Sequence, residues 1–325
     1  MSLPHLRILA TGGTIAGSAG SATRRGYQPG QIGVGDLLAT AERLNLGATF
    51  DGRQIAAIGS QDIGWREWDA LHGAISQALA DRAVGGVIVT HGTDTAEETA
   101  FLLDLALPAG KPVVLVGAMR PADAVGSDGM RNLANAIRVA GDPHAADRGV
   151  LVVMSDQVFA AIDVRKAATS GAEAFRGFPR GPIGTVTPTS LDWFGPPDRI
   201  GRAARFSWPA DLPKVPVVTA YAGMDAESIA CALAGQTRGI VLAGMGQGNA
   251  PDAVIAALGA AGVPVVRSTR VDQGAVDRNL EIDDDALGFV AARGLGPAKA
   301  RVLLQMLIAN GITDPAAMQA EFDRR

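Results

Sequence analysis

The sequence predicts an α/β fold with two domains: a larger N-terminal domain with a mostly parallel sheet and a smaller C-terminal domain with a parallel, flavodoxin-like sheet. Short β-branched runs such as GGVIVT and KPVVLVGAM alternate with longer helical patterns in the first half of the chain. A stretch rich in Pro, Gly and Arg then interrupts the alternation, which starts again after it. With 325 residues, of which 47% are hydrophobic, the chain is long enough to bury two cores.

The interruption sets the expected domain boundaries. Residues 194–214 read FGPPDRIGRAARFSWPADLPK and show no sustained period, which is typical of a connecting segment. We therefore expect an N-terminal domain over residues 1–193, a linker over 194–214 and a C-terminal α/β domain over 215–325.

Local patterns predict the individual elements. In the first half, strands are expected at LRILAT, GGVIVT, KPVVLVGAM and RGVLVVMS, with helices over 65–80 and 96–107. In the second half, VPVVTAYAG, RGIVLAGMG and VPVVRSTRV are expected to be strands separated by helices. A helix from about Pro297 should stop at Asn310-Gly311, and a short one should begin near Thr313-Asp314-Pro315.

Composition limits the classes of partner and the compartment. Twenty-nine basic and 33 acidic residues give a net charge of -4 without a block of like charge, so no nucleic acid and no anionic membrane surface is expected to bind. No run of apolar residues is long enough to span a bilayer. The start MSLPHLRILATGG lacks the pattern of an export signal. We therefore expect a cytoplasmic location, with the periplasm as the alternative if a signal was removed.

The opening loop GGTIAG is the first candidate site. It fits neither the dinucleotide fingerprint nor a phosphate loop, because the glycine spacing is wrong and no Gly-Lys-Ser/Thr ending follows. Two glycines beside Thr14 would let the backbone approach a small ligand closely. A Gly-rich turn with an incidental Thr14 explains the loop equally well.

The second candidate is VIVTHGTDTAEET, in which a strand runs into short polar residues and then a helix. Thr95 followed by Glu98 fits a capping box, which accounts for Thr95 and leaves Thr93 unassigned. Capping of the helix and binding of a ligand explain Asp94 equally well. The residue follows a strand, and open α/β sheets bind ligands at the ends of their strands. His91 is a possible base, but a histidine at a strand end is more often structural.

Two further segments have polar residues that allow two interpretations. Ser60 and Gln61 in GSQDI could hold a carboxylate or an amide, or form an ordinary polar turn. Lys166 in AIDVRKAATS is either a solvated surface charge or a lysine kept neutral by desolvation that serves as a base. The acidic run EIDDDAL lacks the spaced ligands of a calcium loop, so a solvated turn is expected. The lone Cys231 is expected to be a buried thiol without a catalytic role.

Taken together, ATGGTIAG, HGTDTAEETA, VGAMRPADAVGSDGMRNL and DVRKAATS resemble the bacterial L-asparaginases and asparaginase-glutaminases of the type II kind. The resemblance continues through GSQDI, GMGQGN and KARVLLQ, and so covers nearly the whole chain in order. It implies an amidohydrolase that converts L-asparagine to L-aspartate and ammonia, with weaker L-glutaminase activity, and no metal or organic cofactor.

The resemblance also implies roles for single residues. Thr14 looks like the nucleophile, with Tyr27 on a lid over it, and Thr93, Asp94 and Lys166 look like a second catalytic group. The substrate is expected to contact Gly13, Ser60, Gln61, Gly92, Thr93, Asp94, Asn249 and Glu281. Asn249 and Glu281 are similar to positions that reach a neighbouring subunit's site, which implies a homotetramer built as a dimer of dimers.

This chemistry is coherent with the residue types. A threonine hydroxyl is a weak nucleophile until a base removes its proton, and a neutral lysine near a second hydroxyl can do so. Backbone amides of the Gly12-Gly13 region or near Thr93 could stabilise the tetrahedral intermediate. Two other hypotheses remain: an amino-acid sensor that uses the same cleft without chemistry, and an amidotransferase subunit, whose relatives carry extra N-terminal sequence.

Overall fold

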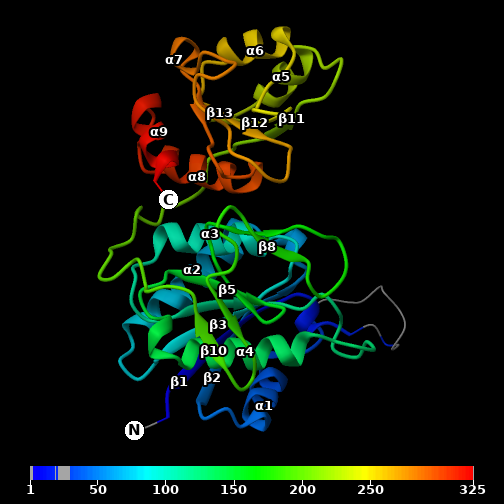
Figure 1. Cartoon of the computed structure of the whole chain (residues 1–325), viewed down its shortest axis with the longest axis vertical. Coiled ribbons are helices and arrows are strands. Elements are labelled where there is room, and N and C mark those ends of the chain that lie inside the picture. Colours follow the sequence, from blue (N-terminus) through cyan, green and yellow to red (C-terminus); the bar gives the residue numbers. More distant parts are fainter. Residues whose placement is uncertain (1–2, 19, 21–29, 325) are drawn as a thin grey trace. The chain divides into compact units, whose positions relative to one another are not determined.

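The computed structural model describes residues 3–18, 20 and 30–324. The chain divides into two compact units, Met1–Arg205 and Phe206–Arg325 (Figure 1). The division falls inside residues 194–214, for which the sequence predicts a linker. The bounds of the predicted linker and of the two predicted domains stay predictions.

The first unit is built on an eight-stranded sheet of described residues, in the order β10-β9-β6-β5-β4-β3-β1-β2. Strands β1 to β5 run parallel, whereas β6, β9 and β10 join as antiparallel strands, so the sheet is mostly parallel as expected. Its strands are β1 (His5–Gly12), β2 (Thr49–Ile58), β3 (Gly86–Thr90), β4 (Val113–Val116), β5 (Val150–Met154), β6 (Gln157–Ala160), β9 (Gly184–Val186) and β10 (Leu191–Trp193).

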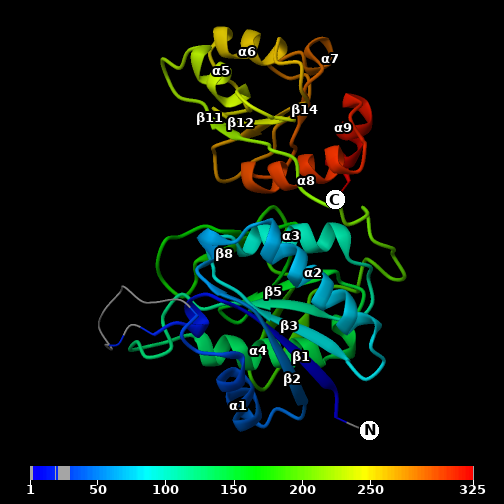
Figure 2. The same cartoon turned by 180° about the vertical axis from the view of Figure 1, so that it is seen from behind.

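Helices cover both faces of this sheet, as seen in Figures 1 and 2. Helices α2 (Trp65–Ala80) and α3 (Ala96–Ala106) pack on one face, and α1 (Val34–Leu44) and α4 (Gly129–Gly141) on the other. The central strands β3, β4 and β5 are buried at every position, because helices cover them on both sides. The helix predicted over 65–80 is confirmed, and the helix predicted over 96–107 ends one residue earlier.

A separate two-stranded hairpin, β7 (Val164–Lys166) and β8 (Phe175–Gly177), lies beside the α2–α3 face. Val164 and Phe175 are buried in the same apolar cluster as residues of α2 and α3, which anchors the hairpin there. Short 3-10 turns η1 (Thr14–Ala16), η2 (Ser60–Asp62) and η3 (Pro143–Ala145) follow β1, β2 and α4. Two of these turns carry candidate site residues.

The second unit contains a parallel sheet in the order β11-β12-β13-β14. Its strand order follows the chain, without the reversal of the flavodoxin order, which refines the flavodoxin-like description. Its elements are β11 (Val217–Thr219), α5 (Glu227–Leu233), β12 (Ile240–Gly244), α6 (Asp252–Gly259), β13 (Val265–Thr269), α7 (Asp284–Leu287), β14 (Val290–Ala291), α8 (Pro297–Ala309) and α9 (Pro315–Asp323). Both predicted C-terminal helices are confirmed, and the Asp314 side chain caps the last one by accepting from the Ala317 amide.

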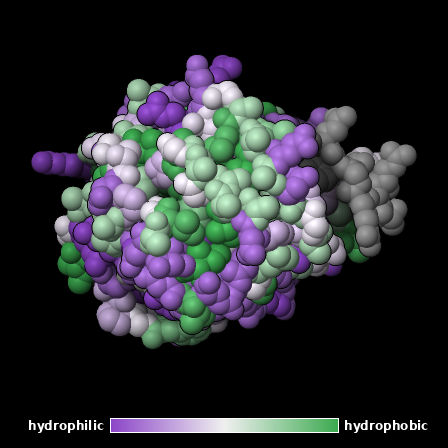
Figure 3. Space-filling model, turned by 90° about the horizontal axis from the view of Figure 1, so that it is seen from above, coloured by the Kyte–Doolittle hydropathy of each residue, from purple (hydrophilic) through white to green (hydrophobic). Residues whose placement is uncertain are grey.

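The exposure of Cys231 and the hydropathy of the surface differ in how they agree with the sequence predictions. Cys231 is exposed, so the expectation of a buried thiol is wrong. The reason is that α5 is short and buries only Ile229, whereas Cys231 lies two positions further round the helix. On the face shown in Figure 3, apolar and hydrophilic side chains are interspersed. Within the described residues, no helix has the length and hydropathy needed to cross a membrane.

Candidate active site

The candidate site forms at the point where the strand order of the first sheet reverses. Strands β1 and β3 are parallel neighbours, with Ala10 opposite Thr90. The chain leaves β1 toward β2 on one side and leaves β3 toward β4 on the other. A crevice outside the carboxyl ends of the strands is expected at such a switch point. Thr14 follows β1 and Thr93 follows β3, so both threonines lie there.

The two loops touch through their glycines. Gly13 has a φ of +78°, and a Cβ added to it would lie 2.4 Å from Cα of Gly92, far closer than real side chains come. A Cβ on Gly92 would in turn lie 2.6 Å from the hydroxyl oxygen of Ser60. The segments that carry Thr14, Ser60 and Thr93 therefore converge so closely that a side chain would not fit at residue 13 or residue 92.

Lys166 reaches this cluster from the β7–β8 hairpin. Its Nζ lies 2.9 Å from Oγ1 of Thr93 and 2.5 Å from Oδ1 of Asp94. The lysine side chain is only 18% exposed, whereas that of Asp94 is 55% exposed. Of the two interpretations of Lys166, the solvated surface charge is thus excluded. A hydroxyl, an amine and a carboxylate stand in direct contact, which is the arrangement that proton transfer requires.

Ser60 and Thr95 join the loop after β2 to the loop after β3. The buried Ser60 hydroxyl accepts a hydrogen bond from the Asp94 amide at 3.1 Å, and the Ser60 carbonyl accepts one from the Thr95 hydroxyl at 2.8 Å. The predicted capping box is therefore wrong: Thr95 is the N-cap of α3, but its side chain makes no capping bond. The Ser60 carbonyl offers the hydroxyl a partner that local sequence could not reveal.

His91 is a structural residue of the β3 end. Its ring is 1% exposed, with Nδ1 2.7 Å from the Gly92 carbonyl and Nε2 3.0 Å from the Thr99 hydroxyl. The Thr99 oxygen also accepts from the indole of Trp68 at 2.9 Å. A neutral ring with its proton on Nδ1 satisfies all of these contacts. Burial lowers the pKa of His91 to about 4, against the raising effect of the bond to Gly92.

A third loop, which sequence reasoning left without an assigned residue, packs against Thr93. A Cβ on Gly117, just after β4, would lie 2.8 Å from the His91 carbonyl oxygen and 3.1 Å from Cγ2 of Thr93. Asp128 accepts hydrogen bonds from the amides of residues 119 and 120, and Asn132 donates to the Gly117 carbonyl at 3.0 Å. The signal in the sequence is an Asp and an Asn four residues apart, which share one face of a helix.

Glu97 is a second residue that sequence reasoning missed. Its Oε2 accepts a hydrogen bond from the backbone amide of Lys166 at 2.9 Å. Glu97 lies in the first turn of α3, directly after the Thr93 loop, so this bond ties the lysine hairpin to the helix that begins at the site. No local pattern could indicate the bond, because its partners are 69 positions apart.

Other predicted site residues are placed differently or lie outside the described residues. The Gly13 amide donates to the Ile58 carbonyl at 3.0 Å, so it is not available to an oxyanion. Gln61 is exposed on η2, where its amide nitrogen lies 3.0 Å from Asp62. Tyr27 lies outside the described residues.

Asn249 and Glu281 are both in the second unit, where the Asn249 amide donates a hydrogen bond to the Glu281 carboxylate. In the run EIDDDAL, expected to be a solvated turn, Glu281, Asp283 and Asp285 are exposed as expected, whereas Asp284 is not. Asp284 is fully buried and pairs with Arg267 through two contacts of 2.6 Å. The buried guanidinium offsets the cost of removing that carboxylate from water.

The fold and the site together define a two-unit α/β enzyme whose polar groups gather at the switch point of its first sheet. The chain belongs to the asparaginase family. Residues 5–199 match the family model for the asparaginase N-terminal domain, and residues 214–322 match that for the glutaminase/asparaginase C-terminal domain.

Relatives of known name are similar over nearly the full chain. The protein is 42% identical to L-asparaginase 2 of Escherichia coli strain K12, with 100% of this chain and 94% of the relative covered. It is 40% identical to a Haemophilus influenzae protein named probable L-asparaginase periplasmic, with 99% and 93% covered. It is 36% identical to the glutaminase-asparaginase of Pseudomonas fluorescens biotype A, with 94% and 86% covered.

Proposed function

We propose that the protein hydrolyses L-asparagine to L-aspartate and ammonia with Thr14 as nucleophile. The observation that carries the proposal is the contact of Lys166 Nζ with both Thr93 Oγ1 and Asp94 Oδ1. These two residues lie on a loop whose Gly92 backbone touches that of Gly13, next to Thr14. Relatives named L-asparaginase 2 and glutaminase-asparaginase support this choice of substrate.

The reaction proceeds in two half-reactions. The Thr14 hydroxyl oxygen attacks the side-chain amide carbon of asparagine while its proton passes to a base. The base then gives that proton to the amide nitrogen, the C–N bond breaks, and ammonia leaves. Water attacks the resulting ester, which releases L-aspartate and restores the Thr14 hydroxyl. Thr93, Asp94 and Lys166 activate the attacking hydroxyl or water, because a neutral lysine nitrogen can accept a proton through the Thr93 hydroxyl in contact with it.

Binding of the substrate's amino-acid end uses the polar groups around this cluster. Asp94 is half-exposed and suited to the ammonium, while Ser60, Gln61 and the amides near Gly92 and Thr93 are suited to the carboxylate and the developing oxyanion. Gly13, which has no side chain, allows the loop that carries Thr14 to lie against the loop that carries Thr93. Tyr27 keeps its proposed role on a lid by resemblance alone.

Association into a homotetramer is part of the same proposal. Asn249, at the carboxyl edge of the second sheet, contacts Glu281 and is expected to reach a neighbouring subunit's site with it. Three apolar side chains of this unit are about half-exposed or more: Tyr221 after β11, Val271 after β13, and Leu280 just before Glu281. Covering such apolar side chains favours self-association. Analytical ultracentrifugation measures the resulting mass.

Weaker hydrolysis of L-glutamine is proposed for the same site. The two substrates differ by one methylene, which a pocket usually distinguishes by only about 1 to 3 kcal/mol. The cytoplasm remains the predicted compartment, and the periplasm, which the name of the Haemophilus relative mentions, is its alternative. Cell fractionation of the native host decides between them.

The first experiment measures ammonia release from L-asparagine and, separately, from L-glutamine. Thr14→Ala and Thr93→Ala are assayed with the wild type, and Thr185→Ala serves as the matched control because Thr185 is exposed on β9. We expect a loss of about a thousandfold or more in the first two variants and none in the control. Thr14→Ala turning over at the wild-type rate contradicts the proposal. Stoichiometric asparagine binding without ammonia release supports a sensor instead.

A further inference from the structure

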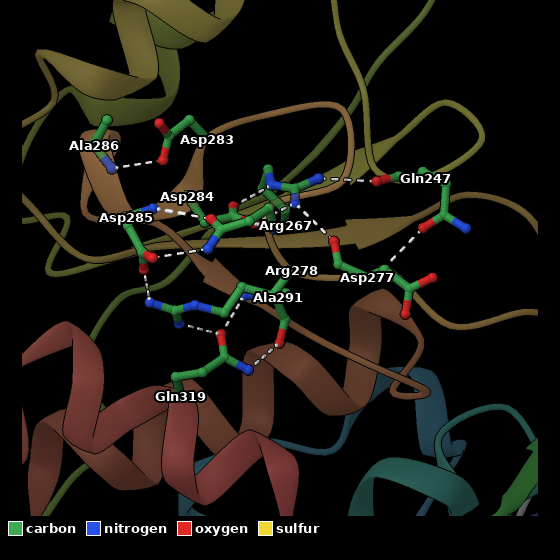
Figure 4. Close-up of polar contacts among 11 residues, drawn as sticks. Gln247, Arg267, Asp277, Arg278, Asp283, Asp284, Asp285, Ala286, Ala291 and Gln319 are labelled. Carbon is green, nitrogen blue, oxygen red and sulfur yellow. Dashed lines mark hydrogen bonds and ion pairs between the residues drawn. The ribbon is translucent and has the colours of Figure 1, made fainter.

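A buried ion pair in the second unit has no place in the chemistry above. Arg267 on β13 is 1% exposed and Asp284 is fully buried, and Figure 4 shows the contacts around them. The Arg267 Nε and Nη2 atoms each lie 2.6 Å from one carboxylate oxygen of Asp284. A buried ion pair often adds little to the stability of the folded protein, because well-packed apolar residues of similar volume stabilise the fold as much or more. The contacts that the pair makes with two neighbouring segments give it a positional role instead.

Arg267 holds the turn that carries Asn249. Its Nη1 donates to the Gln247 carbonyl at 2.8 Å, and a Cβ added to Gly248 would lie 3.0 Å from the same nitrogen. The turn is closed by two backbone hydrogen bonds between Met245 and Asn249. The guanidinium therefore fixes the middle of a tight turn whose last residue is Asn249.

The same pair holds the segment that carries Glu281 at both of its ends. At one end, the Asp277 carbonyl accepts from Arg267 Nη2 at 3.2 Å, and the Asp277 amide donates to Gln247 Oε1 at 2.9 Å. At the other end, Asp284 accepts from the Asn279 amide at 2.9 Å as well as from Arg267. Glu281 lies in the chain between Asp277 and Asp284, the two residues that Arg267 contacts.

A further set of contacts connects the segment around Glu281 to α9 and completes a network of hydrogen bonds and ion pairs around Arg267 (Figure 4). Asn279 donates to Asp285 at 2.7 Å, and Arg278 pairs with Asp285 and donates to Gln319 at 2.9 Å. Gln319 in turn bonds the amide and the carbonyl of Ala291 on β14. The Glu281 segment is thus tied to the sheet and to a helix, although it has little secondary structure of its own.

We infer that Arg267, Asp284 and Gln247 are positioning residues, which hold Asn249 and Glu281 in the geometry that the proposed substrate contact needs. The inference rests on the proposed function of Asn249 and Glu281. Because these residues would bind substrate and not transfer protons, loss of the network should raise KM and leave kcat nearly unchanged.

The test compares KM and kcat for L-asparagine across purified full-length variants. Gln247→Ala removes the side-chain bond to the Asp277 amide, and Gln247→Glu keeps an oxygen acceptor there. We expect KM to rise about threefold to tenfold in the alanine variant and to stay near the wild-type value in the glutamate variant. Gln236→Ala, an exposed glutamine of the same unit, is the matched control.

Arg267→Lys gives the stronger test, because lysine lacks the fork that binds both oxygens of Asp284. We expect KM to rise at least tenfold, roughly the loss of one charged hydrogen bond. Thermal unfolding is recorded for every variant. If Arg267→Lys does not fold, the comparison of KM between Gln247→Ala and Gln247→Glu alone tests the inference.

The outcomes separate this inference from the proposed function. If the wild type releases no ammonia, the proposed function fails. If Asn249→Ala and Glu281→Ala leave KM unchanged, the premise that these residues bind substrate fails, and the inference with it. If those two raise KM while folded Gln247→Ala and Arg267→Lys do not, only the inference is overturned. A fall in kcat at constant KM in Gln247→Ala also overturns it.

Discussion

Nζ of Lys166 lies 2.9 Å from the hydroxyl oxygen of Thr93, although the two residues are 73 positions apart in the chain. The lysine comes from a hairpin outside the main sheet, and the threonine from the end of a central strand. This contact is the structural basis of the proton transfer that we propose for the site.

Replacement of Lys166 by methionine removes the amine and is expected to lower kcat about a hundredfold to ten thousandfold, the usual contribution of a general base. Lys166→Arg keeps a positive charge in contact with Asp94 but cannot become neutral, so we expect it to be nearly as inactive. Steady-state ammonia release measures both. A near-wild-type rate for Lys166→Arg would show that the charge of Lys166 matters and its basicity does not.

Glu97→Ala leaves the backbone amide of Lys166 without its carboxylate partner and loosens the hairpin at the site. We expect kcat to fall about tenfold, the equivalent of one hydrogen bond to a charged group. Glu97→Gln retains an oxygen acceptor and should recover most of the activity. Equal losses in both variants would mean that the charge of Glu97, and not its hydrogen bond, is needed.

Gly13→Ala tests the backbone contact between the two threonine loops. The added Cβ would lie 2.4 Å from Cα of Gly92 at a φ of +78°, so strain and overlap act together. We expect a loss of about 2 to 5 kcal/mol in the free energy of unfolding.

The control for this variant is Gly20→Ala, since Gly20 has a φ of +63° but nothing within 4 Å of the added Cβ. Gly20→Ala should therefore lose only the backbone strain of alanine at a positive φ, about 1 to 2 kcal/mol in the free energy of unfolding, without any overlap of the added Cβ. Urea unfolding of both variants measures the difference. Equal losses at Gly13 and Gly20 would contradict the close approach of Gly13 and Gly92.

His91 makes stability depend on pH. Its pKa is about 4 in the folded protein, against an ordinary value of 6.5 for a solvated histidine, so the unfolded chain binds more protons between these values. The stability contributed by the neutral ring is therefore fully present above pH 6.5 and is lost as the pH falls toward 4, by about 3 kcal/mol in total.

Urea unfolding between pH 4 and pH 7 measures this slope. His91→Gln, which cannot take up the proton, should show a clearly smaller change over that range. His144→Gln is the control, since the imidazole of His144 is 79% exposed. An unchanged slope in His91→Gln would contradict the assignment of a buried neutral ring.

Much of the fold could be predicted from the sequence, because strands and helices leave local periodic patterns. The helix over 65–80 and both C-terminal helices follow from such patterns and from proline and glycine at their ends. The polar residues after two strands likewise indicated where the candidate site lies. Recognition of the family rested on whole motifs and not on any single loop.

Only the tertiary structure decided which partner each polar side chain takes. The Thr95 hydroxyl bonds the Ser60 carbonyl and makes no cap, and Asp284 is buried against Arg267 although its neighbours in the chain are acidic. For Lys166, the local sequence allowed both a surface charge and a desolvated base, and only the hairpin places its Nζ against Thr93. The physical reason is that periodicity is set by the local chain, whereas burial and hydrogen bonding depend on segments that are distant in sequence and meet only on folding.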